Sequence, residues 1–221
     1  MVDSYKHSRY DISSLPDAQF EPGSRGRVLK NKLGIKSKRE MDEAESVALK
    51  AAIHNLIGIY DKDHRFTAAD IRAIHKIWLC DIYEWAGEYR QVNVSKGDFH
   101  FAAAKQVPLL MSELQKSPLH KHTPCNFKSM ERVIQALAEV HVELVLIHPF
   151  REGNGRVARL LSTLMAFQSG LPMLNFRDIT GKKRKDYFDA ISSGLDRDYK
   201  PIEKLFEKII ATSEKISGAE L

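Results

Sequence analysis

The sequence is poor in cysteine and has no long apolar run. Its two cysteines, Cys80 and Cys125, cannot build a disulfide framework and lack the spacing of a metal site. No run of roughly 18 or more apolar residues is present, which excludes a membrane-spanning helix. Met1–Lys6 lacks the apolar core of a secretory signal, so we expect a cytoplasmic protein with reduced thiols. Delivery into another cell by a different route stays open.

Acidic residues are missing from Arg25 to Arg39, where seven basic residues occur without a carboxylate. The chain has 34 Lys and Arg against 29 Asp and Glu, a net charge of +5. Residues 1–40 hold nine basic and five acidic residues, a net charge of +4. Residues 41–221 hold the remaining 25 basic and 24 acidic residues, a net charge of +1. Residues 1–40 are also rich in turn-forming Ser, Pro and Gly. We therefore expect a basic N-terminal arm over 1–40 and one catalytic domain over 41–217.

The hydrophobic spacing of the rest predicts a mainly α fold of about six to eight helices with one β-hairpin. Asn126 is expected to cap the most apolar helix, and Pro118 and Pro124 to bracket a loop before it. Gly87 is expected to end the second helix. The helices are predicted over about residues 42–60, 67–86, 102–116, 127–147, 155–168, 181–194 and 201–217, and the hairpin over Tyr89–Phe101.

The segment His148–Arg159 places several phosphate-binding features at one helix junction. A helix that begins just after Gly153-Asn154-Gly155 presents free backbone N–H groups, which attract anions. Arg156 and Arg159 lie three residues apart, hence on one face near that end. Glu152 is suited to Mg²⁺ shared with a phosphate, and His148 to accepting a proton from a hydroxyl. The segment therefore indicates a site that binds an anion and a metal ion beside a general base.

This segment, His-Pro-Phe-Arg-Glu-Gly-Asn-Gly-Arg-Val-Ala-Arg, resembles the Fic motif at every specified position. The resemblance extends to Trp85–Arg90, Ser95–Gly97 and Asp198–Pro201. It implies transfer of AMP from ATP to a Tyr, Ser or Thr hydroxyl of a target protein. By the same resemblance His148 is the general base and Glu152 the Mg²⁺ ligand. The phosphate-binding residues it implies are Gly153, Asn154, Gly155, Arg156 and Arg159.

The same resemblance suggests further parts of the site. The hairpin around Ser95, Lys96 and Gly97 is expected to bind the target backbone as a flap and so register the modified side chain. Tyr187 is a candidate for the adenine pocket, with a core tyrosine as the equal alternative. No glutamate lies in the inhibitory pattern (Ser/Thr)-x-x-x-Glu-(Gly/Asn) that many Fic proteins carry. We therefore expect a separate, antitoxin-like inhibitor that pairs with Arg159.

Three alternatives stay open at this stage. The first is transfer of UMP, phosphate or phosphocholine on the same fold, although the intact Gly-Asn-Gly-Arg run favours AMP. The second is a nucleic-acid-binding regulator that uses Arg25–Arg39 and the run Lys182–Lys185. Nucleic acid is disfavoured because these segments lack interleaved aromatic residues. The third is an inactive scaffold, which the complete motif disfavours.

Overall fold

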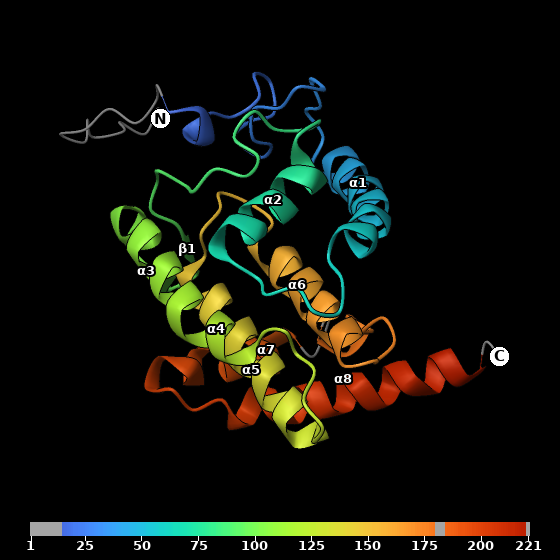
Figure 1. Cartoon of the computed structure of the whole chain (residues 1–221). Coiled ribbons are helices and arrows are strands. Elements are labelled where there is room, and N and C mark those ends of the chain that lie inside the picture. Colours follow the sequence, from blue (N-terminus) through green and yellow to red (C-terminus); the bar gives the residue numbers. More distant parts are fainter. Residues whose placement is uncertain (1–14, 180–183, 220–221) are drawn as a thin grey trace.

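Helix α5 (Met130–Ile147) is the central element of the fold. The computed structural model describes residues 15–179 and 184–219, and α5 passes through the middle of this region (Figure 1). Its apolar residues Val133, Leu137, Val140 and Leu144, spaced four, three and four apart, are buried. Helices that pack against it include α3 (Val107–Leu114), α6 (Asn154–Gln168), α7 (Arg184–Ser193) and α8 (Lys200–Ala219). The expected mainly α fold is confirmed.

Two further helices cover the other side of α6. Helix α1 (Lys38–Ile59) packs on α2 (Ala68–Leu79), and α2 contacts α6. Ser37 caps α1 through the backbone N–H of Glu40. Thr67 begins α2 with a reciprocal capping box to Asp70, which satisfies two of the backbone donors that a helix start leaves open. These caps set where each helix starts, and thus which faces meet α6.

The predicted hairpin is present but shorter than expected. Strands β1 (Ser95–Lys96) and β2 (Phe99–His100) pair antiparallel, with Ser95 opposite His100 and Lys96 opposite Phe99. Gly97 takes a φ of +56° at the turn, a conformation that glycine adopts without strain. The flanking residues 89–94 run irregularly because Arg90 ties them to other loops.

The predicted end of the second helix was wrong. Helix α2 ends at Leu79, and both Ile82 and Tyr83 turn back to donate backbone N–H bonds to the carbonyl of Leu79 at 2.9 Å. Tyr83 and Trp85 then enter the core. Gly87 closes the following turn with a φ of +84°, close against the side chain of Lys76. Burial of the two aromatic rings outweighs continuation of the helix.

The bracketing prolines and the Asn126 cap were also wrong. A short 3₁₀ turn (Ala104–Gln106) leads into α3, and a π-helical turn (Gln115–Leu119) extends it to α4 (His120–His122). Pro118 therefore lies inside helical backbone, where the wide turn accommodates its missing N–H. Helix α5 begins only after Ser129, which has an extended backbone, so Asn126 stays in the preceding loop.

The N-terminal segment packs against the domain in its described part, residues 15–37. Val28 and Leu29 are buried, and the backbone N–H of Lys32 donates to the carbonyl of Ile82 at 2.8 Å. Asp17 is buried, its carboxylate accepts the backbone N–H of Gln91 at 2.8 Å, and its carbonyl accepts Arg151 at 2.7 Å. Part of the expected basic arm thus braces the motif loop. Lys182 and Lys183 of the second basic run lie outside the described residues.

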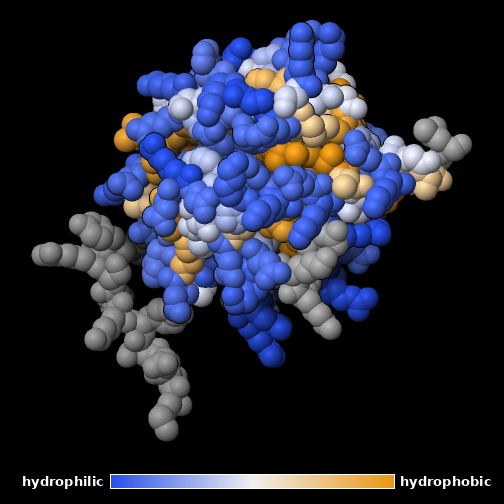
Figure 2. All heavy atoms as spheres, turned by 90° about the horizontal axis from the view of Figure 1, so that it is seen from below, coloured by the Kyte–Doolittle hydropathy of each residue, from blue (hydrophilic) through white to orange (hydrophobic). Residues whose placement is uncertain are grey.

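Within the described residues, no helix is long and apolar enough to cross a membrane. The face seen from below the view of Figure 1 is mainly hydrophilic, with smaller apolar patches (Figure 2).

Candidate active site

A cavity of about 690 Å³ lies where the start of α6, the hairpin and α7 meet. Ten of the eleven predicted site residues line this cavity. They are Ser95, Lys96, His148, Glu152, Gly153, Asn154, Gly155, Arg156, Arg159 and Tyr187. Gly97 stays outside the lining, at the hairpin turn.

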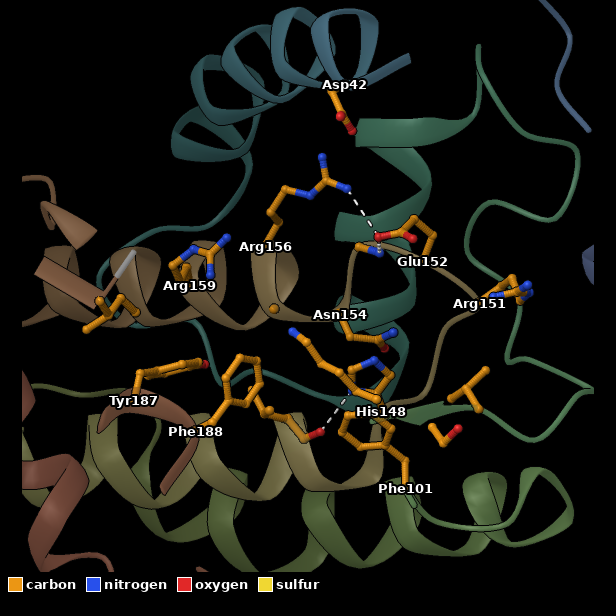
Figure 3. Close-up of a pocket in the computed structure, with 17 residues that line it drawn as sticks. Asp42, Phe101, His148, Arg151, Glu152, Asn154, Arg156, Arg159, Tyr187 and Phe188 are labelled. Carbon is orange, nitrogen blue, oxygen red and sulfur yellow. Dashed lines mark hydrogen bonds and ion pairs between the residues drawn. The ribbon is translucent and has the colours of Figure 1, made fainter. Parts of the chain in front are cut away.

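The N-terminus of α6 lies at one end of this cavity. Gly153 is the N-cap, with a φ of +83°, so the first N–H groups of the helix open toward the cavity rather than into a preceding turn. Arg156 and Arg159 project from the first turns of the same helix (Figure 3). Two guanidinium groups and a helix dipole of the same sign make this end strongly attractive to a polyphosphate.

The motif loop is held in shape by its own side chains. The side chain of Asn154 accepts the backbone N–H of Phe150 and donates to its carbonyl, both at 2.7 Å. These two bonds fix the orientation of the Asn154 amide within the loop. Phe150 is fully buried and stacks on His75, with ring centroids 3.9 Å apart.

His75 links this loop to the turn after α2. Its Nδ1 accepts the backbone N–H of Gly87 at 2.8 Å, so its Nε2 carries the proton and donates to the carbonyl of Glu152 at 3.2 Å. Burial lowers the pKa of His75 to about 4, so the ring is neutral at pH 7 and keeps both bonds. Nothing in the sequence pattern singled out His75.

His148 sits directly after α5 in the left-handed conformation, with a φ of +53°. Its Nδ1 donates to the carbonyl of Val145 at 3.1 Å, so the lone pair lies on Nε2. The ring stacks on Phe101 at 3.6 Å, and Arg90 donates to the His148 carbonyl at 2.7 Å. Burial lowers the pKa of His148 to about 4. The imidazole is therefore a fixed, neutral proton acceptor at pH 7.

Glu152 is the acid on the cavity rim. One oxygen accepts the backbone N–H of Gly153 at 3.0 Å and lies 3.4 Å from Nη2 of Arg156. No group of three or more metal-ligating side chains occurs among the described residues. A single half-exposed carboxylate beside a phosphate site matches the usual requirement of Mg²⁺, which takes one or two carboxylates and completes its shell with phosphate oxygens and water.

The hairpin and α7 close the cavity on the side opposite α1. The Lys96 ammonium lies 3.8 Å from the ring centroid of Phe188, a cation–π contact that joins the hairpin to α7. Phe188 and Phe101 line the cavity with Tyr187 (Figure 3). Phe101, Phe188 and Asp42 were not predicted as site residues, because they come from separate elements with no common spacing. Arg151 was not predicted either, although it lies within the motif segment.

Tyr187 is oriented by a buried chain of hydrogen bonds. Ser162 donates to the carbonyl of Ala158 at 2.9 Å, so its oxygen accepts Nδ1–H of His141 at 3.0 Å. Nε2 of His141 must then accept the hydroxyl of Tyr187, at 2.8 Å. Burial lowers the pKa of His141 to about 3, which keeps this ring neutral. The proton of the Tyr187 hydroxyl is thus committed to His141, and its oxygen can act toward a ligand only as an acceptor.

Three buried neutral histidines make the fold sensitive to acid. His75, His141 and His148 have pKa values of about 4, 3 and 4 because of burial, against about 6.5 when unfolded. At pH 7.5 and above, neither state binds these protons to a large extent. As the pH falls toward 4, the unfolded chain takes up to three protons that the folded chain excludes. Stability should then fall by up to about 4 kcal/mol per pH unit.

This loss can be measured by urea unfolding at pH 7.5, 6.5 and 5.5. Replacing the exposed His54 by Gln should leave the slope unchanged, whereas His141→Gln should reduce it by about a third. Equal stability at pH 7.5 and 5.5 would mean that the three rings are not held neutral by the fold.

The architecture is that of a helical protein in which a helix N-terminus with two arginines shares a cavity with a neutral imidazole. Residues 65–166 match the model of the Fic/DOC family. A probable protein adenylyltransferase of Sinorhizobium fredii is 25% identical over 90% of this chain and 98% of its own length. Together with the complete motif, these matches show that residues 65–166 resemble a Fic/DOC family domain.

Solved structures agree with this assignment. The N-terminal Fic domain of an effector from Bartonella sp. AR 15-3 has the same fold, with a TM-score of 0.75 and 21% identity over 97% of this chain and 98% of that one. BepC of Bartonella tribocorum, with bound AMPPNP, has a TM-score of 0.65 and 25% identity over 82% of this chain and 91% of that one.

Proposed function

We propose that this chain is a protein adenylyltransferase that transfers AMP from ATP to a hydroxyl side chain of a target protein. The observation that carries the proposal is the single cavity that holds a neutral His148 together with Glu152 and the arginine-bearing start of α6. The similarity to a probable protein adenylyltransferase and to an AMPPNP-bound Fic protein supports it.

In the proposed reaction, the target hydroxyl oxygen attacks the α-phosphorus of ATP and pyrophosphate leaves. Nε2 of His148 accepts the hydroxyl proton, while Nδ1 remains bound to Val145. Arg156, Arg159 and the first N–H groups of α6 stabilise the charge that builds on the phosphate oxygens. The backbones of Gly153 and Gly155 admit the phosphates at close range.

Glu152 would hold Mg²⁺, which neutralises phosphate charge when bound. The hairpin, through Ser95–Gly97, would receive an extended segment of the target as an added strand. The target itself is defined here only as a protein with an accessible Tyr, Ser or Thr.

The direct test uses the intact chain, Mg²⁺ and a host-cell lysate with ATP labelled at either the α- or the γ-phosphate. Protein labelling from α-labelled ATP alone supports AMP transfer. Labelling from the γ position alone would instead establish phosphorylation, and labelling from UTP would establish UMP transfer. If the unaltered chain labels no more protein than a His148→Ala variant does, the proposed enzymatic activity is refuted.

We also propose that inhibition comes from a separate, antitoxin-like protein whose glutamate reaches Arg159. The support is the lack of the inhibitory pattern in the sequence and the position of Arg159 in the cavity. Purification of the tagged chain from its native host should recover a small partner that lowers the labelling rate. Recovery of a fully active chain alone would contradict this part.

Tyr187 provides a test of how the site would select adenine over other nucleobases. We expect its oxygen to accept a hydrogen bond from the amino group of adenine, because its own proton is committed to His141. Tyr187→Phe removes this acceptor and should reduce the preference for ATP over UTP by about tenfold. Leaving the buried Nε2 of His141 without a donor should also destabilise the fold by about 1–3 kcal/mol.

The measurement is a competition between the two nucleotides, combined with thermal unfolding. Tyr199→Phe is the matched control, since Tyr199 donates to Glu143 at 2.6 Å and does not line the cavity. If the nucleotide preference is unchanged in Tyr187→Phe, the adenine base does not bind at Tyr187.

A further inference from the structure

Arg156 is joined to helix α1, an element outside the motif. Its Nη2 lies 2.6 Å from Oε2 of Glu45, and Glu45 is only 1% exposed. Figure 3 shows Arg156 extending from α6 toward α1, where Asp42 lies one turn before Glu45. A buried carboxylate is unfavourable unless it is paired, so this contact accounts for the presence of an acid at this position.

Glu45 is itself fixed from the opposite side. The Tyr83 hydroxyl donates to its Oε1 at 2.7 Å, and Nε1 of Trp78 donates to its backbone carbonyl at 2.9 Å. The Trp78 ring also lies 4.5 Å from the guanidinium of Arg156. Side chains from α1, α2 and the following turn thus surround one arginine of the phosphate site.

The contacts leave part of Arg156 for a ligand. Both ion pairs, to Glu45 and to Glu152, use Nη2, and Nε and Nη1 carry further donors on a side chain that lines the cavity. An unrestrained arginine loses considerable side-chain entropy when it binds phosphate, whereas a restrained one has already lost it.

We propose that Glu45 is a positioning residue, which restrains the guanidinium of Arg156 in the orientation that receives the phosphates of the nucleotide. This inference rests on the proposed function for the identity of the ligand. It assigns a role in the reaction to a residue of α1 that touches no substrate atom.

Charge alone and positioning predict opposite results. Removing the carboxylate of Glu45 makes the cavity more positive, so a purely electrostatic effect would tighten nucleotide binding. Loss of the restraint on Arg156 would weaken binding instead. The isosteric substitution Glu45→Gln separates the two, because it removes the charge and keeps an oxygen for Tyr83.

The experiment measures binding of AMPPNP with Mg²⁺ by calorimetry, alongside kcat and KM for AMP transfer. Glu45→Gln should raise both the Kd for AMPPNP and the KM for ATP by the roughly tenfold that loss of a supporting partner produces. Tyr83→Phe changes no charge and should weaken binding in the same direction by a smaller factor. Glu43→Gln, at an exposed position of the same helix, is the matched control.

A double-mutant cycle gives a readout that a merely structural role would not move. In an Arg156→Ala background, Glu45→Gln should have no further effect on the Kd. Tighter or unchanged binding in Glu45→Gln would overturn the proposal, as would effects that add in the double variant. If Glu45→Gln does not fold, normal affinity in Tyr83→Phe would overturn it.

Binding and transfer also separate this inference from the proposed function. Weakened AMPPNP binding in Glu45→Gln, with no AMP transfer by the unaltered chain, would support the role of Glu45 and refute the adenylyltransferase. AMP transfer by the unaltered chain, together with normal AMPPNP binding in Glu45→Gln, would support the adenylyltransferase and refute the role of Glu45.

Discussion

Replacing His148 by Asn should reduce AMP transfer by about a thousandfold while nucleotide binding is retained. Asn adopts the left-handed backbone of this position, with its φ of +53°, more readily than Ala does. It cannot accept the target proton as an imidazole does. The rate should therefore fall because the base is lost, and not because the loop has changed.

The measurements are the transfer rate with α-labelled ATP, AMPPNP affinity and thermal unfolding. The surface variant His54→Asn should match the unaltered chain in all three. A His148→Asn variant that keeps more than a tenth of the rate would show that another group accepts the proton.

The pH profile provides an independent check on the same residue. The base acts when unprotonated, and burial lowers the pKa of His148 to about 4. Its unprotonated fraction is then nearly constant between pH 8 and 6, and kcat/KM should be flat over that interval. An ordinary histidine with a pKa of about 6.5 would lose roughly three quarters of its active form at pH 6.

Gly153→Ala should cause the second large effect, on both stability and activity. Gly153 has a φ of +83°, and a Cβ atom there would lie 2.6 Å from Cζ3 of Trp78. Trp78 is buried and bonded to the backbone of Glu45, so the ring cannot move aside freely. We expect a loss of about 3 kcal/mol in the free energy of unfolding, from overpacking and backbone strain together.

The same substitution should lower AMP transfer by at least about tenfold, because Gly153 caps the helix that binds the phosphates. Gly58→Ala is the control: it lies within α1 with open space around it and should be neutral or slightly stabilising. Trp78→Phe should partly restore Gly153→Ala by making room. Normal melting of Gly153→Ala alone would contradict the predicted clash.

The motif illustrates what local sequence predicts well. The run from Gly153 to Arg159 predicted a helix start, two arginines on one face and an adjacent acid, and the structure places all of them around one cavity. These features depend on residues within two helical turns, where spacing along the chain sets spacing in space.

Several helix boundaries were predicted less well. The second helix ends at Leu79 because Tyr83 and Trp85 turn into the core, and Pro118 lies within a helical turn. In both places burial of side chains against distant elements outweighs the local preference for a helix or a loop. The hydrophobic pattern carries no information about which neighbours those side chains meet.

The sequence by itself determined the mainly helical class, the most apolar helix and the residues that the His148–Arg159 segment brings to one cavity, because these depend on local periodicity and on residue type. Only the tertiary structure decided the neutral state of His148, the proton direction at Tyr187 and the restraint of Arg156 by Glu45. A pKa and a hydrogen-bond direction depend on burial and on partners. Glu45 and Arg156 lie more than 100 residues apart in sequence, and only folding brings them within 2.6 Å.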